Sequence, residues 1–142
     1  MKTKLEIQSD HKHLTYEKVK FKSLAEGRNK LLKTEIYTSS KAESLIYPDK
    51  HYIGNGSKKH FISDDGLYNQ FITRETAFMN GMFIESPNGN LSSEETENWI
   101  CEKKKLKKIR FFAKDSKTGH YVGQGIFHQV GSNKTSILWK KI

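Results

Sequence analysis

Cysteine and proline are scarce in this chain, and long apolar runs are absent. The single cysteine, Cys101, can form neither an intramolecular disulfide nor a CxxC metal knuckle, which excludes a disulfide scaffold and a zinc finger. No stretch is apolar enough to span a membrane, and the N-terminal segment MKTKLEIQSDHKHLTYEKVK is charged throughout, so we expect no export signal. These absences predict a reducing, cytoplasmic location and no membrane partner.

Negative charge is also in short supply. The chain has 25 Lys and Arg residues against 16 Asp and Glu residues, which gives a net charge of +9. An excess of this size favours polyanionic partners, and nucleic acid is the general case. With 142 residues, 35% of them hydrophobic, the chain can bury one core, so we treat residues 1–142 as a single domain.

Helical periodicity is clearest near the N-terminus. Apolar residues from Phe21 to Leu32 recur at spacings of three, four and seven, which predicts an amphipathic helix over 21–32 within a helical part of about 14–34. A β-rich part then runs from about 35 to 142. Its first half holds short β-favouring runs separated by turn-forming clusters, and these runs are EIYTS, SLIYP, HYIG, HFI and YNQFIT.

The last third of the chain predicts an antiparallel meander. Three β-favouring runs, at 108–114, 120–130 and 134–140, are joined by DSKTG and GSNK, which suit hairpin loops. Strict alternation in the second run places Tyr121 and Phe127 on one face, together with two glycines that permit a bend or the close approach of another backbone. Ser92 and Glu95 have capping-box spacing, which predicts a short helix through Trp99.

Together these elements predict the fold class. We expect an α+β fold that is mainly β, with an N-terminal helix, short strands and a C-terminal meander that forms a curved sheet or a small barrel.

Residues 83–142 also carry an ordered series of short motifs. FIESPNGNLSSEETENWI leads from a phenylalanine through a serine-rich turn to an aromatic–aliphatic step. KKIRFFAKDSKTGHYVGQGIFHQV joins a strand of lysines and apolar pairs to a strand that reads aromatic, apolar, glycine, and ILWK follows. The series resembles the C-terminal domain of unknown function of bacterial superfamily-2 helicases of restriction or defence type. The residues that carry it are Phe83, Ser86, Asn88, Ser92, Ser93, Glu94, Trp99, Ile100, Lys107, Lys108, Phe111, Phe112, Lys114, Tyr121, Val122, Gly123, Trp139 and Lys140.

The resemblance implies a small, mostly β module that works beside DNA-processing machines, and so favours duplex DNA over RNA. It supplies no reaction, and it connects the chain with restriction or with phage–host conflict. Ile84 stands where the family has a tryptophan, and the loop around Gly119 is shorter.

The strongest charge cluster is the lysine run in CEKKKLKKIR. Lysines neutralise phosphates and release counterions, and aromatic rings stack on bases. Phe112 and Tyr121 are expected to be exposed, since each lies opposite the aliphatic set of its strand, and His120 would reach a groove or a displaced base. The predicted nucleic-acid-binding residues are Lys103, Lys104, Lys105, Lys107, Lys108, Arg110, Phe112, Lys114, His120 and Tyr121.

Two other functions stay open at this point. One is a protein-binding inhibitor or adaptor in phage–host conflict, whose basic surface meets an acidic partner. The other is a small metal-independent ribonuclease, which needs a base, an acid and a cation at the phosphate. The candidates for those roles are His60, Arg74, Glu75, His120 and His128.

No spacing among the six histidines fits a zinc site, and we predict neither a cofactor nor a catalytic set. The sequence thus favours a non-enzymatic module. Gly54 to Lys58 is interpreted as a turn because it lacks the spacing of a phosphate-binding loop, and Cys101 as a buried residue.

Overall fold

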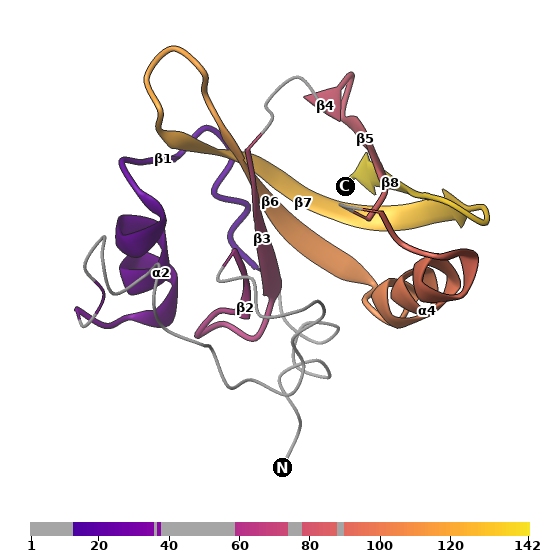
Figure 1. The fold of residues 1–142 in the computed structure, drawn as a ribbon. Helices are drawn as coiled ribbons and strands as arrows, with labels where there is room; N and C mark the ends of the chain where they lie inside the picture. The colour runs from indigo at the N-terminus through magenta and orange to yellow at the C-terminus, as the bar shows by residue number, and fades with distance from the viewer. Residues whose placement is uncertain (1–12, 36, 38–58, 74–77, 88–89) are drawn as a thin grey trace.

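The computed structural model describes residues 13–35, 37, 59–73, 78–87 and 90–142. In this part the chain forms an α+β fold that is mainly β (Figure 1). The described elements are β1 (Lys20–Phe21), α2 (Leu24–Leu32), β2 (His60–Ile62), β3 (Tyr68–Ile72), β4 (Phe78–Met79), β5 (Met82–Glu85), α4 (Ser93–Lys104), β6 (Lys108–Lys114), β7 (Tyr121–Ser132) and β8 (Ile137–Lys141). Neither described helix is long and apolar enough to cross a membrane.

Helix α2 confirms the predicted N-terminal helix but begins only at Leu24. Ser23 caps it, because the Ser23 hydroxyl accepts a hydrogen bond from the backbone N–H of Glu26. Gly27 lies so close to the sheet that a Cβ there would be 2.7 Å from the ring of Phe71, which explains a glycine inside the helix. Residues 13–23 are not helical, and two of them form β1.

Helix α4 begins with the predicted capping box. Ser92 Oγ accepts a hydrogen bond from Glu95 N–H at 3.1 Å, and the Glu95 carboxylate accepts one from Ser92 N–H at 3.2 Å. The helix continues past Trp99 to Lys104, so the first lysines of the basic run are helical. Successive helical residues point in different directions, and this turns Lys103 inward while Lys104 stays exposed.

The sheet has the strand order β2-β3-β6-β7-β8-β5-β4, and β1 adds to β7. The predicted meander is confirmed, since β6, β7 and β8 pair in antiparallel fashion, and HFI and YNQFIT form β2 and β3. One parallel pair, β3 with β6, joins the two halves of the sheet. The sheet does not close into a barrel. The predicted strands EIYTS, SLIYP and HYIG fall wholly or mostly outside the described residues.

Strand β7 is irregular, and its irregularity corrects the predicted alternation. Phe111 of β6 is opposite Gly125, and the next residue, Phe112, is opposite Gly123, so Gln124 is an extra residue in a β-bulge. One extra residue inverts the alternation of side chains, so Tyr121 and Phe127 lie in different core clusters and the prediction that they share a face was wrong. The predicted close approach is confirmed, because a Cβ on Gly123 would lie 1.7 Å from the carbonyl oxygen of Tyr16.

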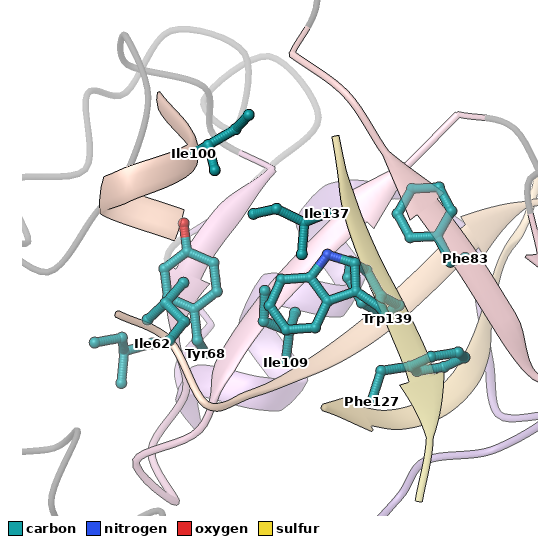
Figure 2. Packing of buried hydrophobic residues seen from close by; sticks show 10 residues of the cluster. Ile62, Tyr68, Phe83, Ile100, Ile109, Phe127, Ile137 and Trp139 are labelled. Atoms are coloured by element: carbon teal, nitrogen blue, oxygen red, sulfur yellow. The ribbon is translucent and has the colours of Figure 1, made fainter. Parts of the chain in front are cut away.

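Two core clusters lie on opposite faces of the sheet. The first contains residues of β2, β3, β5, β6, β7 and β8 together with Ile100 of α4, and Figure 2 shows the ring of Trp139 at its centre. The second contains Phe61, Phe71, Phe112 and Tyr121, packed under α2 and β1. Helices α2 and α4 thus cover opposite faces, and they lie at opposite ends of the sheet (Figure 1).

Candidate nucleic-acid interface

Lys103 was predicted to bind phosphates, but its side chain is fully buried and does not reach solvent. Its Nζ lies 3.0 Å from Glu85 Oε2 and also donates a hydrogen bond to Gln70 Oε1. Glu85 Oε1 in turn accepts a hydrogen bond from Trp139 Nε1 at 2.9 Å. Burial lowers the pKa of Lys103, and the negative charge of Glu85 opposes that shift. The charge of Lys103 is therefore compensated inside the fold and does not contribute to a surface for phosphates.

Arg110 is the second predicted phosphate ligand that the structure buries completely. Its guanidinium donates hydrogen bonds to Asp65 Oδ2 at 2.6 Å, Asn69 Oδ1 at 3.0 Å and the Leu14 carbonyl oxygen at 3.0 Å, and it lies over the ring of Tyr16. The placement follows from β6, whose Arg110 faces the side of the sheet that residues 13–21 cover. The sequence pattern gave no sign that residues 13–21 cover this side of β6, so Arg110 was predicted to be accessible to phosphates.

Its partner Asp65 has a pKa below the usual 3.8. Partial burial alone would raise the pKa of this carboxyl, but hydrogen bonds from Ser63 and Arg110 outweigh burial.

The prediction that Phe112 and Tyr121 are exposed was wrong, because both rings are buried in the second core cluster. Phe112 stacks on Phe71 with 4.7 Å between ring centroids, and Tyr121 meets Phe71 edge-on at 5.1 Å. Alternation along β6 correctly placed Phe112 opposite Ile109 and Phe111, but both faces of the sheet are covered here. None of the described aromatic side chains is exposed.

The other predicted residues remain accessible but fall into two groups. Lys104, Lys105 and Lys107 are exposed at the end of α4 and before β6, and Lys105 forms an ion pair with Glu102 at 2.9 Å. Lys114 and His120 lie at the far end of β6 and beside the β6–β7 loop. The structure therefore does not bring all ten predicted residues together.

A row of three basic side chains lies across the middle of the sheet. Lys108 of β6 is directly opposite His128 of β7, and His128 is directly opposite Lys140 of β8. We call these three residues the basic row. The row lies on the same side of the sheet as Arg110 and Phe112, opposite the side that carries Ile109, Phe127 and Trp139, but beyond the area under α2.

The side chains of the basic row have no competing partners among the described residues. The ion pairs and hydrogen bonds of the described part include neither the ring of His128 nor the ammonium groups of Lys108 and Lys140. Lys140 is exposed, and Lys108 and His128 are partly exposed. The positive charges of Lys108 and Lys140 therefore face solvent.

Sequence reasoning selected only Lys108 from this row. Lys140 entered through the family resemblance, and His128 only as an acid–base candidate. The pairing of the predicted meander was the signal that would have aligned all three residues.

Apolar side chains adjoin the basic row on the same surface. Leu138 pairs with Ile84 on one side and with Gly131 on the other. Ile84 is 67% exposed, and Leu138 is partly exposed. We call the surface formed by the basic row with Ile84 and Leu138 the open face, because no described element packs on it.

The histidine candidates do not form a catalytic group in the described part of the chain. His60 is partly buried beside Tyr68, and this burial, followed by the positive charges of Lys103 and Lys59, lowers the pKa of His60 well below its ordinary value. His120 and His128 are separated by most of β7, on the order of 20 Å at about 3.3 Å per residue. The described residues hold no cluster of three metal-ligating side chains.

The remaining candidates lie partly outside and partly within the described residues. Arg74, Glu75 and the segment 54–58 lie outside the described residues. Cys101 is exposed on α4, which corrects the prediction that it is buried.

Neither a protein-family model, nor a curated protein, nor a solved structure matches this chain.

Proposed function

We propose that this protein is a nucleic-acid-binding module that holds the backbone of duplex DNA on its open face. The observation that carries the proposal is the basic row, in which Lys108, His128 and Lys140 lie side by side and have no described counter-charge. Three exposed lysines, Lys104, Lys105 and Lys107, precede Lys108 along the chain, and of these Lys105 is paired with Glu102. Unpaired cations at this density attract phosphates and release counterions when they bind.

The described aromatic residues favour a duplex over a single strand. Proteins that bind single-stranded nucleic acid without sequence preference stack bases on exposed rings. The described rings are at most partly exposed, and Phe112 and Tyr121 are packed against other aromatic residues. Cations without stacking rings suit a regular phosphate backbone, so the mechanism that we propose relies on lysines and not on Phe112, Tyr121, Lys103 or Arg110.

Fluorescence-polarisation titrations test this function. The full chain would be titrated against matched duplex DNA, single-stranded DNA and RNA at low and at physiological salt. We expect duplex DNA to bind most tightly and its affinity to fall steeply with salt. A flat salt dependence, or tighter binding to single strands, would contradict the proposal.

A charge-matched pair of variants locates the binding surface. We expect the double substitution Lys108→Gln and Lys140→Gln to weaken duplex binding and to reduce the slope of log K against log salt by roughly two, about one for each lysine. The control, Lys22→Gln with Lys117→Gln, removes the same charge from exposed positions away from the basic row. Equal losses in both variants would show that only the total charge matters.

The resemblance of residues 83–142 to restriction-type helicase domains supports a place in restriction or phage–host conflict, which we also propose. Phe83, Phe111 and Trp139 carry part of the resemblance, and all three pack in the first core cluster. The residues that carry the resemblance thus lie more in the core than on the open face. Plating efficiency of phage on cells that express the protein, or its Lys108→Gln, Lys140→Gln variant, tests this role. Identical plating with and without the protein would count against it.

A protein-binding inhibitor or adaptor is the second candidate function. The exposed Ile84 and the partly exposed Leu138 favour it, because apolar side chains beside cations suit an acidic protein with an apolar patch. A protein that leaves duplex DNA unshifted, and that co-elutes with an enzyme only while Ile84 is intact, would favour this function over DNA binding.

A further inference from the structure

The open face is the outer side of a curled sheet. Phe83 of β5 and Phe111 of β6 have ring centroids 5.2 Å apart, although β7 and β8 lie between their strands. Such contact requires the sheet to curl around the first core cluster, and Phe78 of β4 reaches Phe111 in the same way, at 5.5 Å. The basic row points away from this cluster, so it lies on the convex side.

The width of the basic row matches the major groove of duplex DNA. Neighbouring strands lie about 4.8 Å apart, so the Cα atoms of Lys108 and Lys140 are separated by roughly 10 Å across β7. Extended lysine side chains widen this span by several ångströms. The major groove is about 12 Å wide and admits a two-stranded ribbon, whereas the minor groove, at about 6 Å, is too narrow for the row.

His128 occupies the centre of this span. Its ring is partly exposed and has no described hydrogen-bond partner, and a neutral imidazole offers one donor and one acceptor. Purine bases present the N7 acceptor in the major groove, beside the O6 acceptor of guanine or the amino donor of adenine. A row with lysines at both ends and an imidazole between them thus has the chemistry to hold two phosphate strands and to reach a base edge.

We infer that His128 reads a purine edge in the major groove of duplex DNA while Lys108 and Lys140 hold the phosphates on either side. This inference rests on the proposed function and adds a base-reading residue to it. The apolar neighbours Leu138 and Ile84 fit the same docking, since the C5-methyl group of thymine is the apolar feature of the major groove. We expect the bound sites to combine a purine with adjacent thymine.

Selection of binding sites from a duplex pool with a randomised centre tests the reading residue. We expect the wild-type chain to enrich a purine position and His128→Ala to lose that preference, with about 5- to 100-fold weaker binding to the enriched site, the range for loss of a good base contact. The salt slope of His128→Ala should stay within one of the wild-type slope, since phosphate contacts are kept. Gln124→Ala, at a partly exposed position of β7 away from the basic row, is the control, and it should retain the preference.

A second measurement probes the groove directly. Replacing the enriched purine by its 7-deaza analogue exchanges the N7 acceptor for a C–H group and keeps the other base-edge groups, so it should weaken wild-type binding and leave His128→Ala binding unchanged. Binding to duplex DNA without an enriched purine, or without an effect of 7-deaza substitution, would overturn the inference and leave the proposed function standing. Absence of any duplex binding would overturn both.

Discussion

The covered and the open parts of the sheet receive basic residues from the same short run, but they treat those residues differently. On the covered parts, Lys103 meets Glu85 and Arg110 meets Asp65, so each cation is neutralised by its own carboxylate. On the open face, Lys108 and Lys140 have no described carboxylate partner. The difference teaches that the cover over a strand, and not the local charge density, decides whether a lysine stabilises the fold or faces a partner.

The largest effect should come from substituting a cation on the covered side. Lys103→Met leaves the buried carboxylate of Glu85 without its counter-charge, which should lower the free energy of unfolding by about 3 to 5 kcal/mol. Lys104→Met, at the next and exposed position of α4, should change it by less than about 0.5 kcal/mol. Urea denaturation of both variants measures the difference. Similar midpoints would show that the Lys103–Glu85 pair is not needed for stability.

The two ends of β7 should differ in their tolerance of a methyl group. Gly123→Ala sets a Cβ against the Tyr16 carbonyl oxygen and should destabilise the fold by about 1 to 3 kcal/mol, because residues 16–19 must move. A Cβ on Gly131 meets no atom within 4 Å, so Gly131→Ala should be neutral or slightly stabilising. Thermal unfolding compares them, and a larger loss at Gly131 would contradict the packing described for Gly123.

Acid should weaken the covered side through Asp65. Since its pKa in the folded chain lies below the ordinary 3.8, the carboxylate stabilises the fold above that pH, and this contribution disappears as the pH falls through the folded value. Asp65→Asn should therefore flatten the dependence of unfolding free energy on pH below about 4. Asp64→Asn, at an exposed neighbour, is the control. An unchanged acid limb in the Asp65 variant would argue against its pairing with Arg110.

The smallest effect on stability should come from the apolar part of the open face. Ile84→Ser replaces a side chain that is two-thirds exposed, so the free energy of unfolding should change by no more than about 0.5 kcal/mol. Chemical denaturation checks this. A loss of several kcal/mol would show that Ile84 is covered, and the open face would then need to be redefined.

Much of the fold was predictable because local signals dominate it. The capping box at Ser92, the runs of the meander and the amphipathic spacing before Leu32 each depend on residues close together in sequence. The parallel pairing of β3 with β6 was not predictable in this way, because it depends on contacts between distant segments. The bulge at Gln124 also escaped prediction, because alternation alone gives no sign of an extra residue.

The candidate site was less predictable than the fold. A strand with Arg110 and Phe112 on one face and Ile109 and Phe111 on the other has the pattern of a half-exposed strand. The missing information was the partner of the N-terminal helix, whose apolar side had to pack on some face of the sheet. If the N-terminal helix is assigned to the side of β6 that carries Arg110 and Phe112, both residues are predicted to be buried. The predicted phosphate ligands are then Lys108 and its cross-strand neighbours.

The parallel pair between β3 and β6 also has a consequence for how the chain folds. Tyr68 and Ile109 are neighbours in the sheet although 41 positions separate them in sequence, whereas Lys114 and Tyr121 are only seven positions apart. Closing the longer loop costs more entropy and must precede the contacts that repay it. We therefore expect the β6–β7–β8 hairpins to nucleate and β3 to dock late, so that mutations in β3 accelerate unfolding more than they slow refolding.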